Sequence, residues 1–124
     1  MTARRYVILK HDHPFLHWDL LIEDQETART WRLLRSPCLN EPIRAEPLSA
    51  HRKHYLTYEG RVSDNRGTVS RHDFGVVTFA SQEGPAEHWR LSGAVFSGMA
   101  VMATLPDSRQ FLTLMADVNR TVDR

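Results

Sequence analysis

The sequence predicts an all-β, mainly antiparallel protein, folded as a small closed or nearly closed β-barrel with at most short helices. Three observations support this fold class. Apolar and β-branched residues occur in many short runs, glycines and prolines separate these runs, and no long helical repeat is present. Closure into a barrel is favoured because it leaves no exposed strand edge. The 124 residues are expected to form one domain, 1–124.

The composition is that of a soluble globular protein, with 41% hydrophobic and 25% charged residues. No apolar run reaches the ~18–20 residues that a membrane-spanning helix needs, so no membrane association is expected. The lone Cys38 and the absence of a recognisable signal peptide favour a cytoplasmic protein, which we expect to be a monomer. The net charge of +1 neither requires nor excludes a nucleic-acid partner.

The first two predicted strands form a hairpin. Tyr6 to Lys10 is rich in β-branched and aromatic residues, and Pro14 interrupts the pattern before a second strand at Trp18 to Glu23. The second strand alternates, which places Trp18, Leu20 and Ile22 on one face and His17, Asp19, Leu21 and Glu23 on the other. We expect the tryptophan face to be buried, and His17 and Asp19 to line an open groove.

Later segments supply the remaining strands. The stretch from Ser36 to Ser49 carries three prolines and predicts an ordered loop, whereas His51 to Tyr58 is ambiguous between a short helix and a strand. The cluster from Asp64 to Gly67 indicates a turn. Further strands are predicted at Trp31 to Leu34, Phe74 to Ala80, His88 to Leu91, Val95 to Thr104 and Phe111 to Met115.

The polar face of the second strand carries a candidate metal site. His17 and Asp19 are two residues apart, so both side chains leave the same face of a strand. His11 ends the preceding strand and can return to the same point across the turn. Two nitrogens and one oxygen suit a divalent cation such as zinc or manganese, without selecting between them. The alternative is a hydrogen-bonded His–Asp pair on a solvated face.

The run from Lys10 to Asp19 resembles the signature of the 3′-phosphoesterase domain of bacterial DNA ligase D, approximately K-H-D-x-x-x-L-H-(Y/W)-D. Four further stretches agree in order with motifs of that family, so the resemblance covers nearly the whole chain. They are Trp31 with Arg35 and Pro37; His51, Tyr55, Tyr58, Glu59 and Gly60; Gly67, Val69, Asp73 and Gly75; and Leu91, Gly93 and Gly98.

The resemblance implies a small β-barrel that uses a divalent metal, usually manganese, to trim the 3′ end of a DNA or RNA primer. Such a protein removes a terminal ribonucleotide and then the 3′ phosphate. The resemblance assigns His11, His17 and Asp19 as metal ligands. It gives His51 contact with the scissile phosphate or an acid–base role, and places the Tyr55 hydroxyl near the same phosphate. Implied partners are DNA or RNA 3′ ends and DNA-repair ligase or polymerase proteins.

Departures from the family pattern indicate a free-standing, divergent relative. Leu21 stands where the family has an arginine that supports phosphate binding. Ser49 and Ala50 replace acidic residues, and His72 replaces a tryptophan. Other arginines are candidates to supply the missing charge, namely Arg44, Arg61 and Arg66.

Three hypotheses follow from these observations. The first is an active metal-dependent phosphoesterase on 3′ ends, favoured by the retained His51 and Tyr55. The second is a catalytically impaired module that binds metal and nucleic acid, favoured by Leu21. The third is a phosphoesterase that acts on a small nucleotide.

Overall fold

The computed structural model describes residues 2–117 of the chain. Within this range almost all regular structure is β, and the helical part is one short 3-10 helix, η1 (Lys53–Leu56). The strands, in chain order, are β1 (Ala3–His11), β2 (His17–Glu23), β3 (Thr27–Leu33), β4 (Ile43–Arg52), β5 (Gly60–Arg61), β6 (Thr68–Glu83), β7 (Ala86–Gly93), β8 (Ser97–Thr104) and β9 (Gln110–Ala116).

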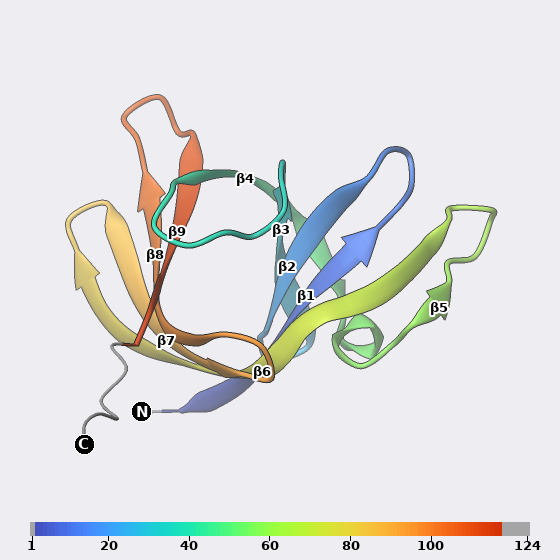
Figure 1. Ribbon diagram of the computed structural model, residues 1–124, viewed down its shortest axis with the longest axis horizontal. Helices are drawn as coiled ribbons and strands as arrows, with labels where there is room; N and C mark the ends of the chain where they lie inside the picture. Colours follow the sequence, from blue (N-terminus) through green and yellow to red (C-terminus); the bar gives the residue numbers. More distant parts are fainter. Residues whose placement is uncertain (1, 118–124) are drawn as a thin grey trace, which may run out of the picture.

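The strands form one sheet that closes into a ring. Its hydrogen-bonded order is β1-β2-β3-β4-β9-β8-β7-β6-β5, and a further pairing between β1 and β6 completes the circuit (Figure 1). Every pairing between named strands is antiparallel. The expected all-β class and antiparallel closure are therefore confirmed.

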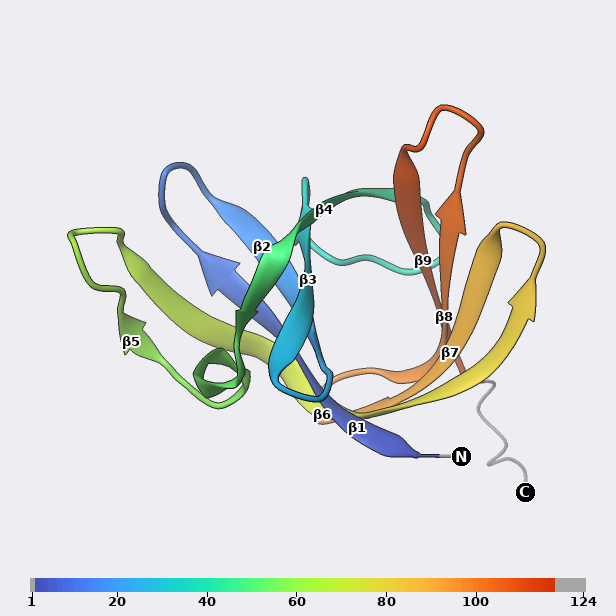
Figure 2. The same ribbon diagram turned by 180° about the vertical axis from the view of Figure 1, so that it is seen from behind.

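Two apolar clusters lie on the two faces of this sheet. The larger one contains fifteen buried residues contributed by strands around the whole ring, including Trp31 and Trp89, whose ring centroids are 5.6 Å apart. The smaller one joins β1, β2 and β3 to Leu56 of η1 and to Val62, the residue after β5. Figure 2 shows η1 and β5 on the same side of the ring as the β1–β2 turn. Both faces of β2 are consequently covered.

The loop expected over Ser36 to Ser49 is wrong in its second half. Strand β4 begins at Ile43 and runs through Pro47, which pairs with Trp31 of β3. Strand β9 pairs only with Ile43 to Ala45, so Pro47 lies where β4 has a free edge. An edge position tolerates a residue that has no backbone N–H. Of the three prolines in this stretch, Pro47 therefore lies at a strand edge and the other two lie in the loop.

The bounds of two other segments also differ from the prediction. The ambiguous segment from His51 to Tyr58 ends β4 and then forms η1. Strand β6 is longer than the predicted Phe74 to Ala80, and its pairing with β1 shifts register at His72, which has no partner there. Such a bulge bends a strand and allows it to serve two neighbours. The predicted turn is present, with Asp64, Asn65 and Gly67 at positive φ.

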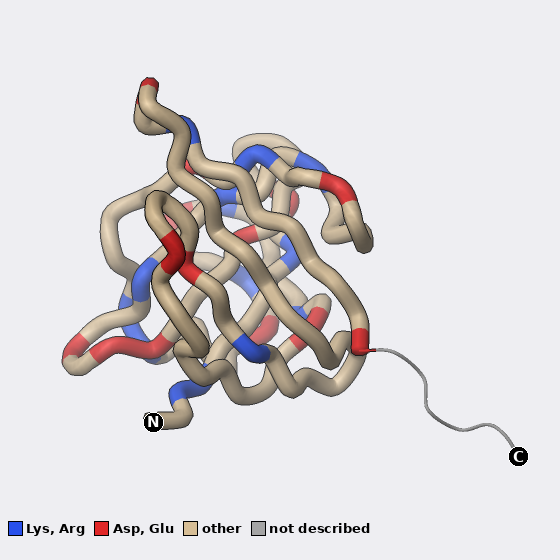
Figure 3. The backbone as a smooth tube through the Cα atoms, turned by 90° about the vertical axis from the view of Figure 1, so that its left-hand side faces the viewer, with Lys and Arg blue, Asp and Glu red and all other residues tan. Residues whose placement is uncertain are grey.

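Charged residues of both signs are interspersed along the chain, as Figure 3 shows, in keeping with the small net charge. Among residues 2–117, no helix is long and apolar enough to cross a membrane.

Asp73 of β6 is a buried carboxylate that accepts several hydrogen bonds. Its carboxylate is 2% exposed and accepts hydrogen bonds from the Tyr6 hydroxyl (2.8 Å) and from the backbone amides of Phe74 (2.9 Å), Val95 (2.8 Å) and Phe96 (3.3 Å). Burial, followed by the bond to Asp73, raises the pKa of Tyr6. Asp73 thus fixes the β7–β8 turn against β1, and Val95 and Phe96 belong to that turn and not to the predicted strand.

We expect Asp73→Ala to destabilise the fold by about 3 kcal/mol or more, because one buried hydroxyl and three partly buried amides would lose their acceptor together. Tyr6→Phe removes a single donor and should cost about 1 kcal/mol. Urea unfolding of the two variants measures the difference, and equal destabilisation would show that Asp73 has no organising role.

Candidate metal centre

The pairing of β1 with β2 brings three side chains to one point. His11 pairs directly with His17, and the ring centroids of these histidines are 4.9 Å apart. The Oδ2 atom of Asp19 lies 3.2 Å from Nε2 of His17 and 3.7 Å from Nδ1 of His11. One ligand atom from each residue lies within 4.8 Å of the other two. The structure therefore brings together the three residues that the sequence singled out.

Backbone carbonyls fix which imidazole nitrogens carry hydrogen. Nδ1 of His17 is 2.8 Å from the carbonyl oxygen of Phe15, and Nε2 of His11 is 2.9 Å from that of Arg66. A carbonyl oxygen only accepts, so these nitrogens donate. In the neutral rings, the nitrogens that face Asp19 then present lone pairs. Two lone pairs directed at a carboxylate repel it unless a cation lies between them.

One carboxylate oxygen of Asp19 also lacks a partner among residues 2–117. Its Oδ1 atom is buried and has no hydrogen-bond partner within the described part of the chain. A buried carboxylate oxygen without a donor is energetically unfavourable, whereas a bound cation would satisfy it. The ligand set of two imidazoles and one carboxylate suits zinc or manganese. The residues present thus fit a divalent cation.

The site is more enclosed than expected. His17 is 1% exposed and Asp19 is 3% exposed, so the prediction that both line an open groove is wrong. The alternation in β2 is as predicted, but Leu56 and Val62 pack with Leu21 over the face that carries them. On the opposite face Leu20 and Ile22 are buried, while Trp18 is only partly buried.

Access to the centre runs through a cavity of about 440 Å³ beside β1 and β2. His11, Asp19, His51 and Tyr55 all line it, so the structure brings the predicted His51 and Tyr55 to the same cavity as two of the candidate metal ligands. Nδ1 of His51 is 3.1 Å from the carbonyl oxygen of Ser49, which leaves Nε2 available. The rings of His51 and Tyr55 lie nearly edge to face, with centroids 6.2 Å apart.

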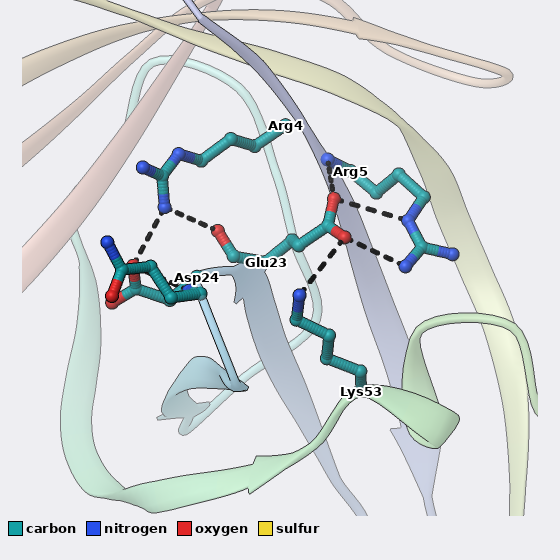
Figure 4. A network of polar contacts seen from close by, with 6 residues as sticks. Arg4, Arg5, Glu23, Asp24 and Lys53 are labelled. Carbon is teal, nitrogen blue, oxygen red and sulfur yellow. Dashed lines mark hydrogen bonds and ion pairs between the residues drawn. The ribbon is translucent and has the colours of Figure 1, made fainter.

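An ion-pair network joins η1, which carries Tyr55, to the end of β2 (Figure 4). Lys53 at the start of η1 lies 3.6 Å from the Glu23 carboxylate, and Arg5 of β1 lies 2.9 Å from the same group. Hydrogen bonds from Arg5 lower the pKa of Glu23 to about 2. Because Glu23 remains ionised, the network links η1 to the hairpin over the whole neutral range.

A second contact fixes the β1–β2 turn. The Asp12 carboxylate accepts hydrogen bonds from the Thr68 amide (2.7 Å) and hydroxyl (2.9 Å), and these bonds lower the pKa of Asp12. Gly67 makes the approach possible, since a Cβ there would lie 2.2 Å from Oδ1 of Asp12 and 2.7 Å from Cβ of His13. The β5–β6 turn is therefore held where the Arg66 carbonyl orients His11.

Of the three arginines proposed from the sequence as phosphate ligands, only Arg66 lines the cavity. Arg66 lines the cavity, but its guanidinium donates to the carbonyl (2.8 Å) and hydroxyl (3.0 Å) of Ser63. Arg44 lies over the Phe111 ring, at 6.0 Å from its centroid, and neither Arg44 nor Arg61 lines the cavity.

Arg32 and Arg52 line the cavity as well and were not among the site residues predicted from the sequence. Arg32 is adjacent to the site through its pairing with Asp19. A register between strands could have identified it, but the periodicity of one strand could not.

Replacing Gly67 tests the docking of the two turns. Gly67→Ala should destabilise the protein by about 1–3 kcal/mol more than Gly84→Ala, because it also breaks the bonds from Asp12 to Thr68. Gly84 is a matched control, with φ of +59° and no atom within 4 Å of an added Cβ. Chemical denaturation gives both values, and indistinguishable losses would contradict the proposed close contact.

Comparison with known proteins places most of this chain in one family. The family described as the DNA Ligase D 3′-phosphoesterase domain matches residues 9–110. The Multifunctional non-homologous end joining protein LigD of Pseudomonas aeruginosa is 32% identical over 60 residues, which cover 47% of this chain and 7% of that protein. The family match includes β2, η1 and the cavity between them. The chain therefore belongs to the DNA ligase D 3′-phosphoesterase domain family.

Proposed function

We propose that this protein is a metal-dependent phosphoesterase that acts on 3′ ends of DNA or RNA primers. It would remove a terminal 3′ ribonucleotide or 3′ phosphate during DNA end repair. The observation that carries the proposal is the convergence of His11, His17 and Asp19 beside a cavity that also contains His51 and Tyr55. Family membership supports the choice of a phosphate ester at a 3′ end.

His11, His17 and Asp19 would hold the cation, with manganese favoured by the family resemblance and zinc also compatible. When bound, a divalent cation polarises a phosphoryl oxygen and lowers the pKa of an attacking water. The Phe15 and Arg66 carbonyls contribute by keeping the ligand nitrogens in the correct tautomer. Backbone carbonyls of the protein would thus orient both histidines for the cation.

His51 and Tyr55 supply groups for the phosphate. Nε2 of His51 can accept a proton when the ring is neutral, or donate a hydrogen bond when it is charged. Tyr55 lines the cavity, and its hydroxyl can donate a hydrogen bond to a phosphoryl oxygen there. Donors of this kind oppose the charge that develops on the phosphate in the transition state.

A second candidate function is a module that binds metal and nucleic acid without turnover. The observation in its favour is Leu21, which is completely buried in the smaller apolar cluster. A leucine offers no donor to a phosphate. Leu21→Arg would also place a charge within that cluster, so simple restoration of the family residue is expected to lower stability.

The name of the Pseudomonas aeruginosa relative refers to non-homologous end joining. On this basis we also propose DNA-repair ligase or polymerase proteins as partners of this chain.

Primer cleavage tests the proposed activity. With manganese, the wild-type protein should release phosphate from a 3′-phosphorylated primer and trim a single 3′ ribonucleotide, and a chelator should stop both reactions. Asp19→Asn should reduce turnover by at least about 100-fold, since loss of a supporting residue alone typically lowers metal affinity or activity by 10–100-fold. His17→Ala should have the same effect.

His88→Ala is the matched control, because His88 is a partly buried histidine that contacts Ser81 and Glu83 far from the cavity. Circular dichroism confirms that each variant is folded. Binding of both primers without cleavage would favour the binding module. Equal kcat/KM for the primer and for a nucleoside 3′-phosphate would identify a small nucleotide as the substrate.

A further inference from the structure

We propose that Arg32 is a phosphate-binding residue of this protein. This inference rests on the proposed function, because it identifies the residue that holds the substrate phosphate at the same site. It also differs from the sequence-based candidates Arg44, Arg61 and Arg66.

The sheet register places Arg32 beside the metal centre. Arg32 of β3 pairs directly with Asp19 of β2, and Thr30 of β3 pairs with Leu21. Paired residues in an antiparallel sheet leave the same face, with Cβ atoms about 4.5–5.5 Å apart. Arg32 therefore emerges on the face that carries Asp19 and Leu21, and it lines the same cavity as His11 and Asp19.

Within residues 2–117, the guanidinium of Arg32 makes no hydrogen bond or ion pair. Its Nε atom is buried without a hydrogen-bond partner in the described residues. Asp19 and Glu46 both occupy register positions opposite Arg32, yet neither forms an ion pair with it. A buried donor without an acceptor is unfavourable, so the arrangement is better explained by an external anion. A phosphate, with several oxygens, can accept two parallel bonds from a guanidinium.

Phe15 limits the freedom of this side chain. The Arg32 guanidinium carbon lies 5.3 Å from the centroid of the Phe15 ring, within the range of a cation–π contact. Phe15 also orients His17 through its backbone carbonyl. One residue of the β1–β2 turn therefore positions both a candidate metal ligand and the proposed phosphate ligand.

The other arginines at the cavity are less suitable. The Arg66 guanidinium is already bonded to Ser63. Arg52 is exposed and lies over the Tyr55 ring, at 5.7 Å from its centroid. Arg32 alone among these three has a buried and unpartnered Nε within residues 2–117.

Binding of two oligonucleotides that differ only at the 3′ end tests the assignment. Fluorescence anisotropy in chelator, where no turnover is expected, compares a 3′-phosphorylated primer with the same primer ending in a 3′ hydroxyl. Wild-type protein should prefer the phosphorylated end, and Arg32→Ala should reduce this preference on the order of 10- to 100-fold. Arg32→Lys should recover only part of it, because an ammonium lacks the planar fork.

Arg29→Ala is the matched control. Arg29 lies on the same strand but on the opposite face, where it contacts Glu87 and the Trp31 ring. This variant removes the same charge and should keep the preference for the 3′ phosphate. Equal preference in wild type and Arg32→Ala, including no preference in either, would overturn the assignment. It would not affect the turnover result that tests the proposed function.

A second measurement uses only the wild-type protein, so it does not depend on whether a variant folds. In the NMR spectrum of the wild-type protein, the Nε–H signal of Arg32 should shift on titration with the 3′-phosphorylated primer and not with the 3′-hydroxyl primer. The Nε–H signal of Arg29 should stay unchanged with both. An unshifted Arg32 signal at saturating primer would contradict direct contact with the phosphate.

Discussion

The register between β1 and β2 is the constraint on which the whole site depends. It sets His11 directly opposite His17 and places Asp19 on the same face, next to both rings. A slip of one residue would turn His17 and Asp19 toward the apolar interior of the ring. Closure of the sheet through β1 and β6 fixes β1 from its other side, so the hairpin that carries the site has little freedom to slip.

Contacts of the β1–β2 turn, the β5–β6 turn and η1 also hold the side chains of the site in place. Asp12 docks the β1–β2 turn onto Thr68, and Lys53 ties η1 to Glu23. As a result, carbonyls from two separate turns orient the two histidines, and the cavity receives His51 and Tyr55 from a third segment. The contacts of Asp12, Phe15 and Arg66 therefore support the geometry of the candidate ligands. A bound cation would supply what this arrangement lacks, namely a positive charge between two lone pairs and a buried carboxylate.

Local patterns in the sequence predicted the parts of the fold that depend on local rules. Alternation in β2 correctly separated Leu20 and Ile22 from His17 and Asp19, and the turn residues from Asp64 to Gly67 were recognised. The pattern could not reveal that η1 and Val62 cover the His17 face, because that contact joins residues more than thirty positions apart. Arg32 was not predicted because its position beside Asp19 follows from the pairing between two strands, which the pattern of one strand does not reveal.

We propose that His11, His17 and Asp19 form one metal centre whose ligand nitrogens are oriented before the metal binds. Anomalous diffraction at the manganese edge, from crystals grown with manganese, is the direct test. It should show one strong peak within bonding distance of Nδ1 of His11, Nε2 of His17 and the Asp19 carboxylate, with the carbonyl contacts of both rings unchanged. A fully loaded crystal with its manganese elsewhere, or with either imidazole turned away, would contradict it.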